Sequence, residues 1–473
     1  MVFTTMFILP LMNTEQIPLE TFVKRCFYEI SPCDPLYNNW HISLLCEVLE
    51  KVHKGEIKRL IICMPPRYLK SICVSTAFPA WLLGVSPSKR VIVASYAMPL
   101  AEKLSVDTKA IVESDWYKEL FPGFTLHKSV NSKRKFLNSQ GGFRLATSVN
   151  GSLTGEGADF LIADDPQKPL DMANKKYREK THNWLLNTFF SRLNNKKNGA
   201  IIIVMQRLHI DDIIGRLTLN KLENCLIQEC NDWSILNLAA IAEQDEPFRK
   251  TGEVLNSQTE DIHTIQRIHE QMGSYHFAAQ YQQNPQNSGG GHLTESQIHF
   301  VNYDINELKN NGVFISVDTA FKTGINNDYT AISIWSETGN SVVLFDVICK
   351  KMEFNDTMSM LRSLFAQYFV HKMLIEDKGS GTSIIQSLHK EFSSKIEAIK
   401  PLKSKEVRFL TAISHLENGD VEIHENVHKE VIEQLLEFPN GKHDDAVDAV
   451  SQFIAWYFKI QKRVIIEPSI RSF

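Results

Sequence analysis

Short apolar runs that end at polar turns constrain the fold of this chain more than any other feature of its sequence. In the first part of the chain these runs cover residues 60–63, 91–96, 160–163 and 201–205. Two of the amphipathic stretches between them, 71–83 with a kink at Pro79 and 99–113, predict helices. Uninterrupted apolar runs are typical of strands that are buried on both faces of a parallel sheet. The sequence therefore predicts an α/β fold for this part of the chain.

The composition is that of an ordinary globular protein. The 473 residues are 43% hydrophobic and 22% charged, with a formal net charge of −4. Any binding to nucleic acid must therefore come from local basic patches. The eight cysteines contain no C-x-x-C pair, which predicts reduced thiols in an intracellular protein. The apolar start at residues 2–12 lacks a basic flank and a cleavage site, so we expect neither a signal peptide nor a membrane span.

A change of texture near residue 290 predicts a domain boundary. The stretch "YQQNPQNSGGGHL" is rich in Gln and Asn and contains three successive glycines, which is typical of a flexible linker. We expect a first domain at 1–285, a linker at 286–292 and a second domain at 293–473. A long surface loop inside one domain is the alternative reading.

After this stretch the order of the predicted elements is different. Three closely spaced strands are expected first, then a helix at about 353–369, and then a strand at 373–375. The three strands cover residues 313–317, 330–335 and 341–347. The rest of the chain is predicted to be mostly helical and to end in a helix at about 443–460. Three antiparallel strands followed by a helix and a strand form the order of an RNase H-like nuclease.

The stretch "ICMPPRYLKS" resembles a phosphate-binding loop that has lost its glycines. The standard loop reads G-x-x-x-x-G-K-[ST], and here Met64 and Leu69 stand at the two glycine positions. The stretch follows a predicted strand and opens a predicted helix, so its N–H groups are aimed at an anion. Lys70 would reach the β and γ phosphates of ATP, and Ser71 would bind Mg²⁺. An ordinary strand-turn-helix with a lysine remains the alternative.

Two further strand ends complete a predicted ATPase site. "DFLIADDP" places Asp164 and Asp165 at the end of an apolar run, where one acid can organise Mg²⁺ and the next can orient the attacking water. "VMQRLH" places Gln206 and Arg207 at the same predicted edge, near the γ phosphate. An Asp-Pro turn without catalytic function is the alternative for the first pair. The predicted ATP-binding residues are Pro66, Arg67, Lys70, Ser71, Asp164, Gln206 and Arg207.

Acidic residues also end the strands of the second part. Asp318 ends its first strand, Glu376 ends its fourth strand, and "HDDAVDAV" opens the last helix. Carboxylates that converge from two strands and a helix can hold two Mg²⁺ or Mn²⁺ ions about 3.5–4 Å apart. Each acid alone can equally be a solvated strand end or helix cap. The predicted metal ligands of this part are Asp318, Glu376, Asp444, Asp445 and Asp448, and the last three are left unranked. The predicted catalytic acids of the two sites are Asp165, Asp318, Glu376 and Asp444.

With both groups of residues in place, the chain resembles the large terminase subunit of tailed bacteriophages and prophages over nearly its whole length. The matching pieces are "LIICMPPRYLKS", "SLTGEGADFLIADDP", "VMQRLHIDDIIGRL", "FAAQYQQNP", "SVDTAFKTGINNDYTAI", "IEDKGSG" and "KHDDAVDAV". The resemblance implies an ASCE-type P-loop ATPase domain followed by an RNase H-like nuclease domain. It implies ATP-driven translocation of double-stranded DNA into a procapsid, and cutting of concatemeric DNA at the start and end of packaging.

The resemblance also implies partners and further residues. The partners are double-stranded DNA, a portal protein, a small terminase subunit and further copies in a ring, in the cytoplasm of the bacterial host. Trp40 and His41 lie where the family contacts adenine. Glu156 stands where many members have an arginine, which leaves Arg144 or Arg207 as a substitute. The tail at 459–473 is a candidate for docking to the portal.

Three basic stretches are candidates for contacts with DNA phosphates, and each can equally be a solvated face. They cover residues 127–136, 175–180 and 400–408. Other functions also stay open at this point. A helicase-like ATPase with an inactive nuclease domain, an RNase H-like recombinase or transposase subunit, and an inactive remnant that only assists capsid assembly would each account for part of the pattern.

Overall fold

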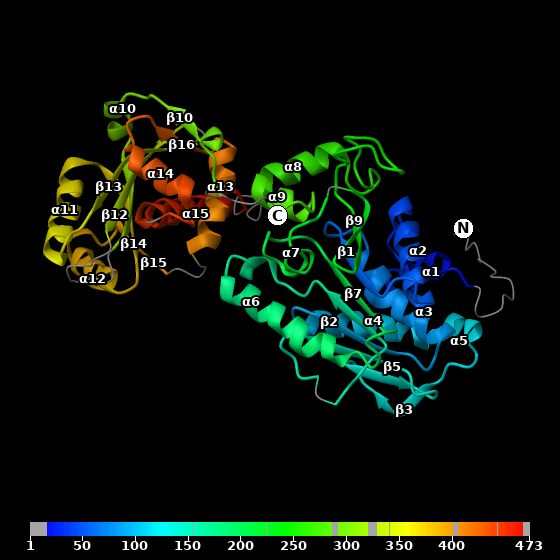
Figure 1. Cartoon of the computed structure of the whole chain (residues 1–473). Coiled ribbons are helices and arrows are strands. Elements are labelled where there is room, and N and C mark those ends of the chain that lie inside the picture. Colours follow the sequence, from blue (N-terminus) through cyan, green and yellow to red (C-terminus); the bar gives the residue numbers. More distant parts are fainter. Residues whose placement is uncertain are drawn as a thin grey trace, which may run out of the picture. The chain divides into compact units, whose positions relative to one another are not determined.

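The computed structural model divides the chain into two compact units (Figure 1). The first comprises Met1–Arg267 and His276–Gln286, and the second comprises Ile268–Tyr275 and Asn287–Phe473. The short segment 268–275 thus packs with the second unit, although it precedes the predicted boundary. The structure describes residues 17–153, 155–223, 225–285, 292–319, 329–339, 341–400, 405–441 and 443–466, with side chains up to 459.

Parts of some sequence predictions lie outside these residues. They are the apolar start at 2–12, almost all of the linker predicted at 286–292, and residues 467–473 of the tail predicted at 459–473. No helix that the structure describes is both long and apolar enough to cross a membrane.

The first unit is built on a nine-stranded sheet in the order β3-β4-β5-β2-β6-β7-β1-β9-β8. The inner strands are parallel, and antiparallel strands complete both edges. The strands are β1 (Arg59–Cys63), β2 (Arg90–Ser95), β3 (Leu126–Asn131), β4 (Lys135–Asn138), β5 (Phe143–Ser148), β6 (Phe160–Asp164), β7 (Ala200–Met205), β8 (Ile227–Cys230) and β9 (Trp233–Asn237). The predicted parallel α/β fold is therefore confirmed.

Helices cover both faces of this sheet. Leu60 and Ile62 of β1 belong to one buried cluster, whereas Ile61 and Cys63 belong to another, which is why the whole run is apolar. The helices of this unit are α1 (Leu19–Ile30), α2 (Trp40–Lys54), α3 (Phe78–Val85), α4 (Met98–Glu113), α5 (Asp115–Leu120), α6 (Lys175–Trp184) and α7 (Ile213–Thr218). Two more, α8 (Ile262–Met272) and α9 (Ser274–Gln280), contain the points at which the chain passes between the units.

The helix predicted at 71–83 is confirmed, with an irregularity at its start. Residues Ile72–Ala77 form a π-helical segment, and α3 continues from it with Pro79 in its first turn. Proline has no N–H to donate and crowds the preceding turn, so a wider turn before it is physically reasonable.

The second unit is built on a seven-stranded sheet in the order β10-β16-β13-β12-β11-β14-β15. β12 is antiparallel to both β11 and β13, whereas β14 is parallel to β11. The strands are β10 (His299–Val301), β11 (Val313–Asp318), β12 (Thr330–Thr338), β13 (Ser341–Lys350), β14 (Val370–Glu376), β15 (Ile396–Ile399) and β16 (Val421–His424). The predicted order of three antiparallel strands, helix and strand is confirmed, but β15 and β16 lie in the part expected to be mostly helical.

Helices also cover both faces of the second sheet. Met358 of α11 and Leu388 of α12 join one buried cluster, and Phe409 of α13 and Phe453 of α15 join the cluster on the other face. The helices are α10 (Ile305–Asn310), α11 (Phe354–Gln367), α12 (Ser380–Phe392), α13 (Lys405–Glu417), α14 (Lys429–Glu437) and α15 (Asp445–Ile466). Because α13 and α15 pack on the same face of the second sheet, they approach the carboxyl ends of β11 and β14 from the same side.

Candidate active sites of the two units

The loop after β1 has the backbone shape that glycine normally provides. Leu69, at the second glycine position of the standard loop, has a φ of 65°, and Arg67 has a φ of 70°. Such left-handed conformations cost a residue with a side chain about 1–2 kcal/mol. Met64 is not among the residues with positive φ, and Pro66 lies in the turn before Arg67. The helix then begins at Lys70, so the N–H groups of the loop stand at a helix N-terminus.

Lys70 is buried at the end of this loop and faces polar groups from two other strands. Its Nζ lies 3.3 Å from Gln206 Oε1 and 3.7 Å from Asp165 Oδ2. The order of the sheet explains this meeting, because β7 lies between β1 and β6 and brings Gln206 between the lysine and the acid. Gln206 in turn donates a hydrogen bond to Gln280 of α9 over 3.3 Å. No role for Gln280 was predicted from its sequence motif.

Ser71 and Asp164 form the second half of this site. The serine hydroxyl donates to Asp164 Oδ1 over 3.0 Å, whereas the buried Oδ2 has no hydrogen-bond partner among the described residues. Burial, followed by the nearby Asp165, raises the pKa of Asp164 to about 7. A buried carboxylate with a free oxygen beside a serine hydroxyl suits the Mg²⁺ ion that accompanies ATP.

Arg207 forms its ion pair away from Ser71 and Asp164. Its Nε lies 2.9 Å from Asp212 Oδ2, and both side chains are buried. Asp212 also accepts from the backbone N–H of Leu208 and of Gly215, so it caps α7. Gln206 therefore faces Lys70, whereas Arg207 stabilises the turn between β7 and α7 through Asp212.

The structure also places Arg144, the other candidate substitute for the missing arginine, and Glu156, which stands at the arginine's position. Arg144 on β5 is fully buried and donates to the carbonyl of Ser75 over 3.2 Å, and burial lowers its pKa to about 9. Glu156 pairs with Lys135 at 2.5 Å.

The residues expected at adenine divide between two environments. Trp40 stacks on Phe248 with 4.8 Å between the ring centroids. His41 is buried beside Tyr68, and burial lowers its pKa to about 4. His41 also lines a cavity of about 150 Å³ together with Arg67 of the loop, whereas Trp40 does not. Of the two, His41 is therefore the one that borders open space next to the loop.

In the second unit, β11 and β14 bring two of the predicted acids together. The strands run parallel, with Val317 opposite Ile375, so Asp318 and Glu376 end at the same edge. Helix α15 is held against this edge by Gln452, whose Nε2 donates to Ser316 Oγ over 3.0 Å and to the Val317 carbonyl over 3.3 Å. Gln452 was not predicted from the sequence, although it follows Asp448 by four residues in the last helix and so lies on the same face of that helix.

Asp448 stands one turn before Gln452 and faces the other two acids. Burial, followed by the charges of Asp448 and Glu376, raises the pKa of Asp318 to about 8. Asp444 is more exposed than Asp448. Asp445 lies near Cys349 of β13, where burial, followed by the charge of Asp445, raises the pKa of the Cys349 thiol to about 11. The structure thus brings together Asp318, Glu376 and Asp448. Three carboxylates that repel one another are a donor set suited to divalent cations.

Two cations of α13 lie among these acids. Lys405 Nζ is 2.5 Å from Asp448 Oδ2 and 2.8 Å from Asp444 Oδ1. Arg408 Nη2 is 2.8 Å from Asp448 Oδ1, and its Nη1 is 3.7 Å from Glu376 Oε2. Within the described part of the chain, no three His, Cys, Asp or Glu side chains are gathered as a metal site. The acids are arranged around the two cations instead.

The basic stretches named as candidates for DNA contact differ in exposure. Strand β3 and its turn at 127–134 are mostly exposed, and Arg134 pairs with Glu102. In α6, Arg178 is buried and binds Asp211 at 3.0 Å, whereas its neighbours Lys175 and Lys176 are exposed. In the third stretch, 401–404 lie outside the described residues, and Lys405 and Arg408 bind acids. These two face the site rather than the solvent.

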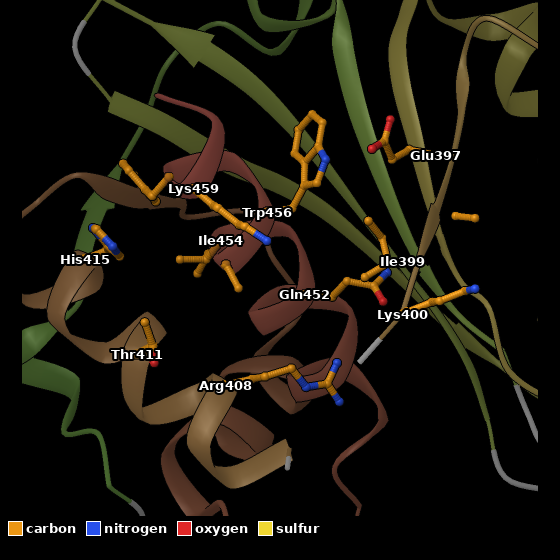
Figure 2. A pocket seen from close by; sticks show the side chains of 13 residues that line it. Glu397, Ile399, Lys400, Arg408, Thr411, His415, Gln452, Ile454, Trp456 and Lys459 are labelled. Atoms are coloured by element: carbon orange, nitrogen blue, oxygen red, sulfur yellow. The ribbon is translucent and has the colours of Figure 1, made fainter. Parts of the chain in front are cut away.

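A cavity of about 580 Å³ adjoins this second site (Figure 2). It lies between the end of β15, α13 and α15, and it is lined by Lys400, Arg408, Gln452 and Trp456, among others. Figure 2 shows Arg408 reaching from α13 toward it. Arg408 therefore borders both the acids and open space.

Comparison with known proteins assigns the second unit. Residues 315–455 match the family model of the terminase RNase H-like domain. No curated protein matches the chain. The match to the family model begins within β11, ends within α15 and includes Asp318, Glu376 and Asp448.

Several solved structures are similar to the chain at low sequence identity. The large terminase of a thermophilic bacteriophage is 10% identical, with a TM-score of 0.48, and the alignment covers 87% of this chain and 98% of that one. The large terminase of bacteriophage HK97 is 11% identical, with a TM-score of 0.38 and coverage of 93% and 99%. The large terminase nuclease of the thermophilic phage G20c with bound magnesium is 16% identical, with a TM-score of 0.27 and coverage of 34% and 93%.

Residues 315–455 of the second unit thus match a terminase RNase H-like domain, and the first unit is an α/β unit built on a sheet whose inner strands are parallel. This match agrees with the resemblance to large terminase subunits that the motifs indicate.

Proposed function

We propose that this chain is the motor and nuclease of viral DNA packaging. It hydrolyses ATP to move double-stranded DNA into a procapsid, and it cuts concatemeric DNA when packaging starts and ends. One observation carries the proposal: a terminase RNase H-like domain is joined to a parallel-sheet unit in which Lys70, Gln206 and Asp164 converge at one edge. The expected partners are a portal protein, a small terminase subunit and further copies of the chain, in the host cytoplasm.

In the ATPase half, each polar group has a distinct task. Lys70 would contact the β and γ phosphates of ATP, and Ser71 with Asp164 would hold the Mg²⁺ ion that arrives with ATP. Asp165 orients the attacking water, and its backbone, with a φ of 42°, is held in place by hydrogen bonds to β7 and to Tyr96. Gln206 contacts Lys70 and donates a hydrogen bond to Gln280, so a shift of Gln206 on loss of the γ phosphate would move α9.

Replacement of the lysine tests this half. Lys70→Ala is expected to abolish ATP turnover in a phosphate-release assay and to keep Mn²⁺-dependent DNA cleavage, because the nuclease acids lie in the other unit. Lys103→Ala on the exposed face of α4 is the matched control and should turn over ATP normally. Undiminished turnover in Lys70→Ala would show that this loop does not bind the phosphates.

In the nuclease half, Asp318, Glu376 and Asp448 form the site. Two divalent ions held there would activate the attacking water and stabilise the leaving 3′ oxygen. Asp318 and Glu376 are fixed by the sheet, and Asp448 is fixed by the hydrogen bonds that tie α15 to β11. The three carboxylates can therefore keep their positions while DNA is bound.

The matching test is Asp318→Ala in a plasmid-cleavage assay with Mg²⁺ or Mn²⁺. Cleavage is expected to be lost while ATP turnover is kept. Asp346→Ala, an exposed strand aspartate of the same unit, should cleave normally. Retained cleavage by Asp318→Ala would remove this residue from the site. Cleavage by the unaltered chain would exclude a helicase-like ATPase whose second domain is inactive.

A further inference from the structure

The acids of the nuclease site are neutralised by the chain itself. Lys405 and Arg408 are three residues apart on α13, so their side chains leave the same face of the helix. Between them they contact both carboxylate oxygens of Asp448, one oxygen of Glu376 and one of Asp444. Only about an eighth of the Arg408 side chain is exposed, and Asp448 is similarly enclosed.

A divalent cation and these two side chains need the same oxygen atoms. Asp448 has no oxygen left without a cationic partner, and an ammonium group 2.5 Å from Oδ2 would repel a metal ion bound to it. In a partly buried site such repulsion is weakly screened by solvent and salt. The metal ion and Lys405 are therefore competitors for Asp448.

Both cationic side chains can move to positions away from the acids. Lys405 is about one-quarter exposed and has a long flexible stem that can turn to solvent. Arg408 borders the 580 Å³ cavity, and its buried Nε makes no hydrogen bond to any described residue (Figure 2). The arrangement can therefore open without unfolding α13, whose other face packs Phe409 and Ile413 into the core.

We propose that α13 is an internal inhibitor of metal loading, with Lys405 as its main element. In the absence of DNA, Lys405 and Arg408 occupy Asp448 and keep the affinity for divalent metal low. The phosphates of a bound duplex offer both cations another partner, so DNA binding and metal binding favour each other. Metal loading of the nuclease site is thereby restricted to chains that already hold DNA. This inference rests on the proposed nuclease function.

The test measures metal binding directly, without activity. The full chain is freed of metal with EDTA, and free Mn²⁺ is titrated by electron paramagnetic resonance. Lys405→Met is expected to bind Mn²⁺ at least about tenfold more tightly than the unaltered chain, and Lys405→Gln should do the same. Lys405→Arg, which keeps the charge, should bind close to the unaltered value. Lys429→Met, on the exposed face of α14, removes a charge elsewhere in the unit and should leave the affinity unchanged.

A second measurement needs no variant. A non-cleavable phosphorothioate duplex should tighten Mn²⁺ binding by the unaltered chain, and this effect should be smaller in Lys405→Met. Equal or weaker Mn²⁺ binding by folded Lys405→Met and Lys405→Gln would overturn the proposal, as would a duplex without effect on the unaltered chain.

Asp318→Asn separates this outcome from failure of the proposed function. If it abolishes Mn²⁺ binding while the lysine variants bind as the unaltered chain does, the metal site stands and the inhibitor role falls. If no variant binds Mn²⁺ and the unaltered chain does not cut DNA, the nuclease function itself fails, and the inference with it.

Discussion

Leu69 allows a quantitative test of how this loop works without its glycines. Its φ of 65° lies in the left-handed region, which costs a residue with a side chain about 1–2 kcal/mol. Leu69→Ala and Leu69→Gly both remove the packing of the side chain against the core of the first unit. The two variants differ mainly in the backbone, where alanine keeps the strain and glycine relieves it. Glycine also loses more conformational entropy on folding, about 0.5–1 kcal/mol.

The balance predicts that Leu69→Gly is more stable than Leu69→Ala by about 0.5–1 kcal/mol. The matched control is Val106 of α4, an exposed helical position, where glycine should be less stable than alanine by about 1 kcal/mol. Scanning calorimetry of the full chain would show the reversal as shifts of about 1–4 °C in the transition of the first unit. Alanine more stable than glycine at both positions would refute the reasoning.

Two further predictions concern buried charges. Arg207→Ala should destabilise the first unit by about 3–5 kcal/mol, because it leaves Asp212 charged and buried, whereas Arg134→Ala, which breaks an exposed pair, should cost at most about 1 kcal/mol. Equal losses of thermal stability in the two variants would contradict the buried pairing. The folded-state pKa of Asp318 is about 8, above its usual value of 3.8, so the native chain keeps a proton that the unfolded chain releases. With EDTA present, this group makes stability fall as pH rises from about 4 to about 8, and Asp318→Asn should lack that contribution. Parallel curves of melting temperature against pH for the two proteins would exclude the raised pKa.

The elements of both units could be predicted from the sequence because their signals are local. An apolar run such as 160–163 records burial on both faces of a sheet, and the amphipathic stretch at 99–113 matches α4 closely. The short strands β15 and β16 were not predicted, because four residues carry too little periodicity to be separated from the helices around them.

The candidate acids could also be predicted, since each follows an apolar run or opens a helix. Their partners could not. Lys405 and Arg408 were visible only as part of a basic stretch with an expected role in binding DNA, although their spacing of three already placed them on one helix face. What that face meets depends on the position of α13 over β11 and β14, which no local pattern records.

The sequence by itself determined the classes of element, the order of the motifs and the identity of the acids at strand ends, because these depend on neighbours along the chain. Only the tertiary structure decided which of them meet. The insertion of β7 between β1 and β6 brought Gln206 to Lys70, and the docking of α15 through Gln452 selected Asp448 from three nearby aspartates. Both results come from packing between segments more than a hundred residues apart, where the order of strands and the fit of helices on a sheet set the geometry.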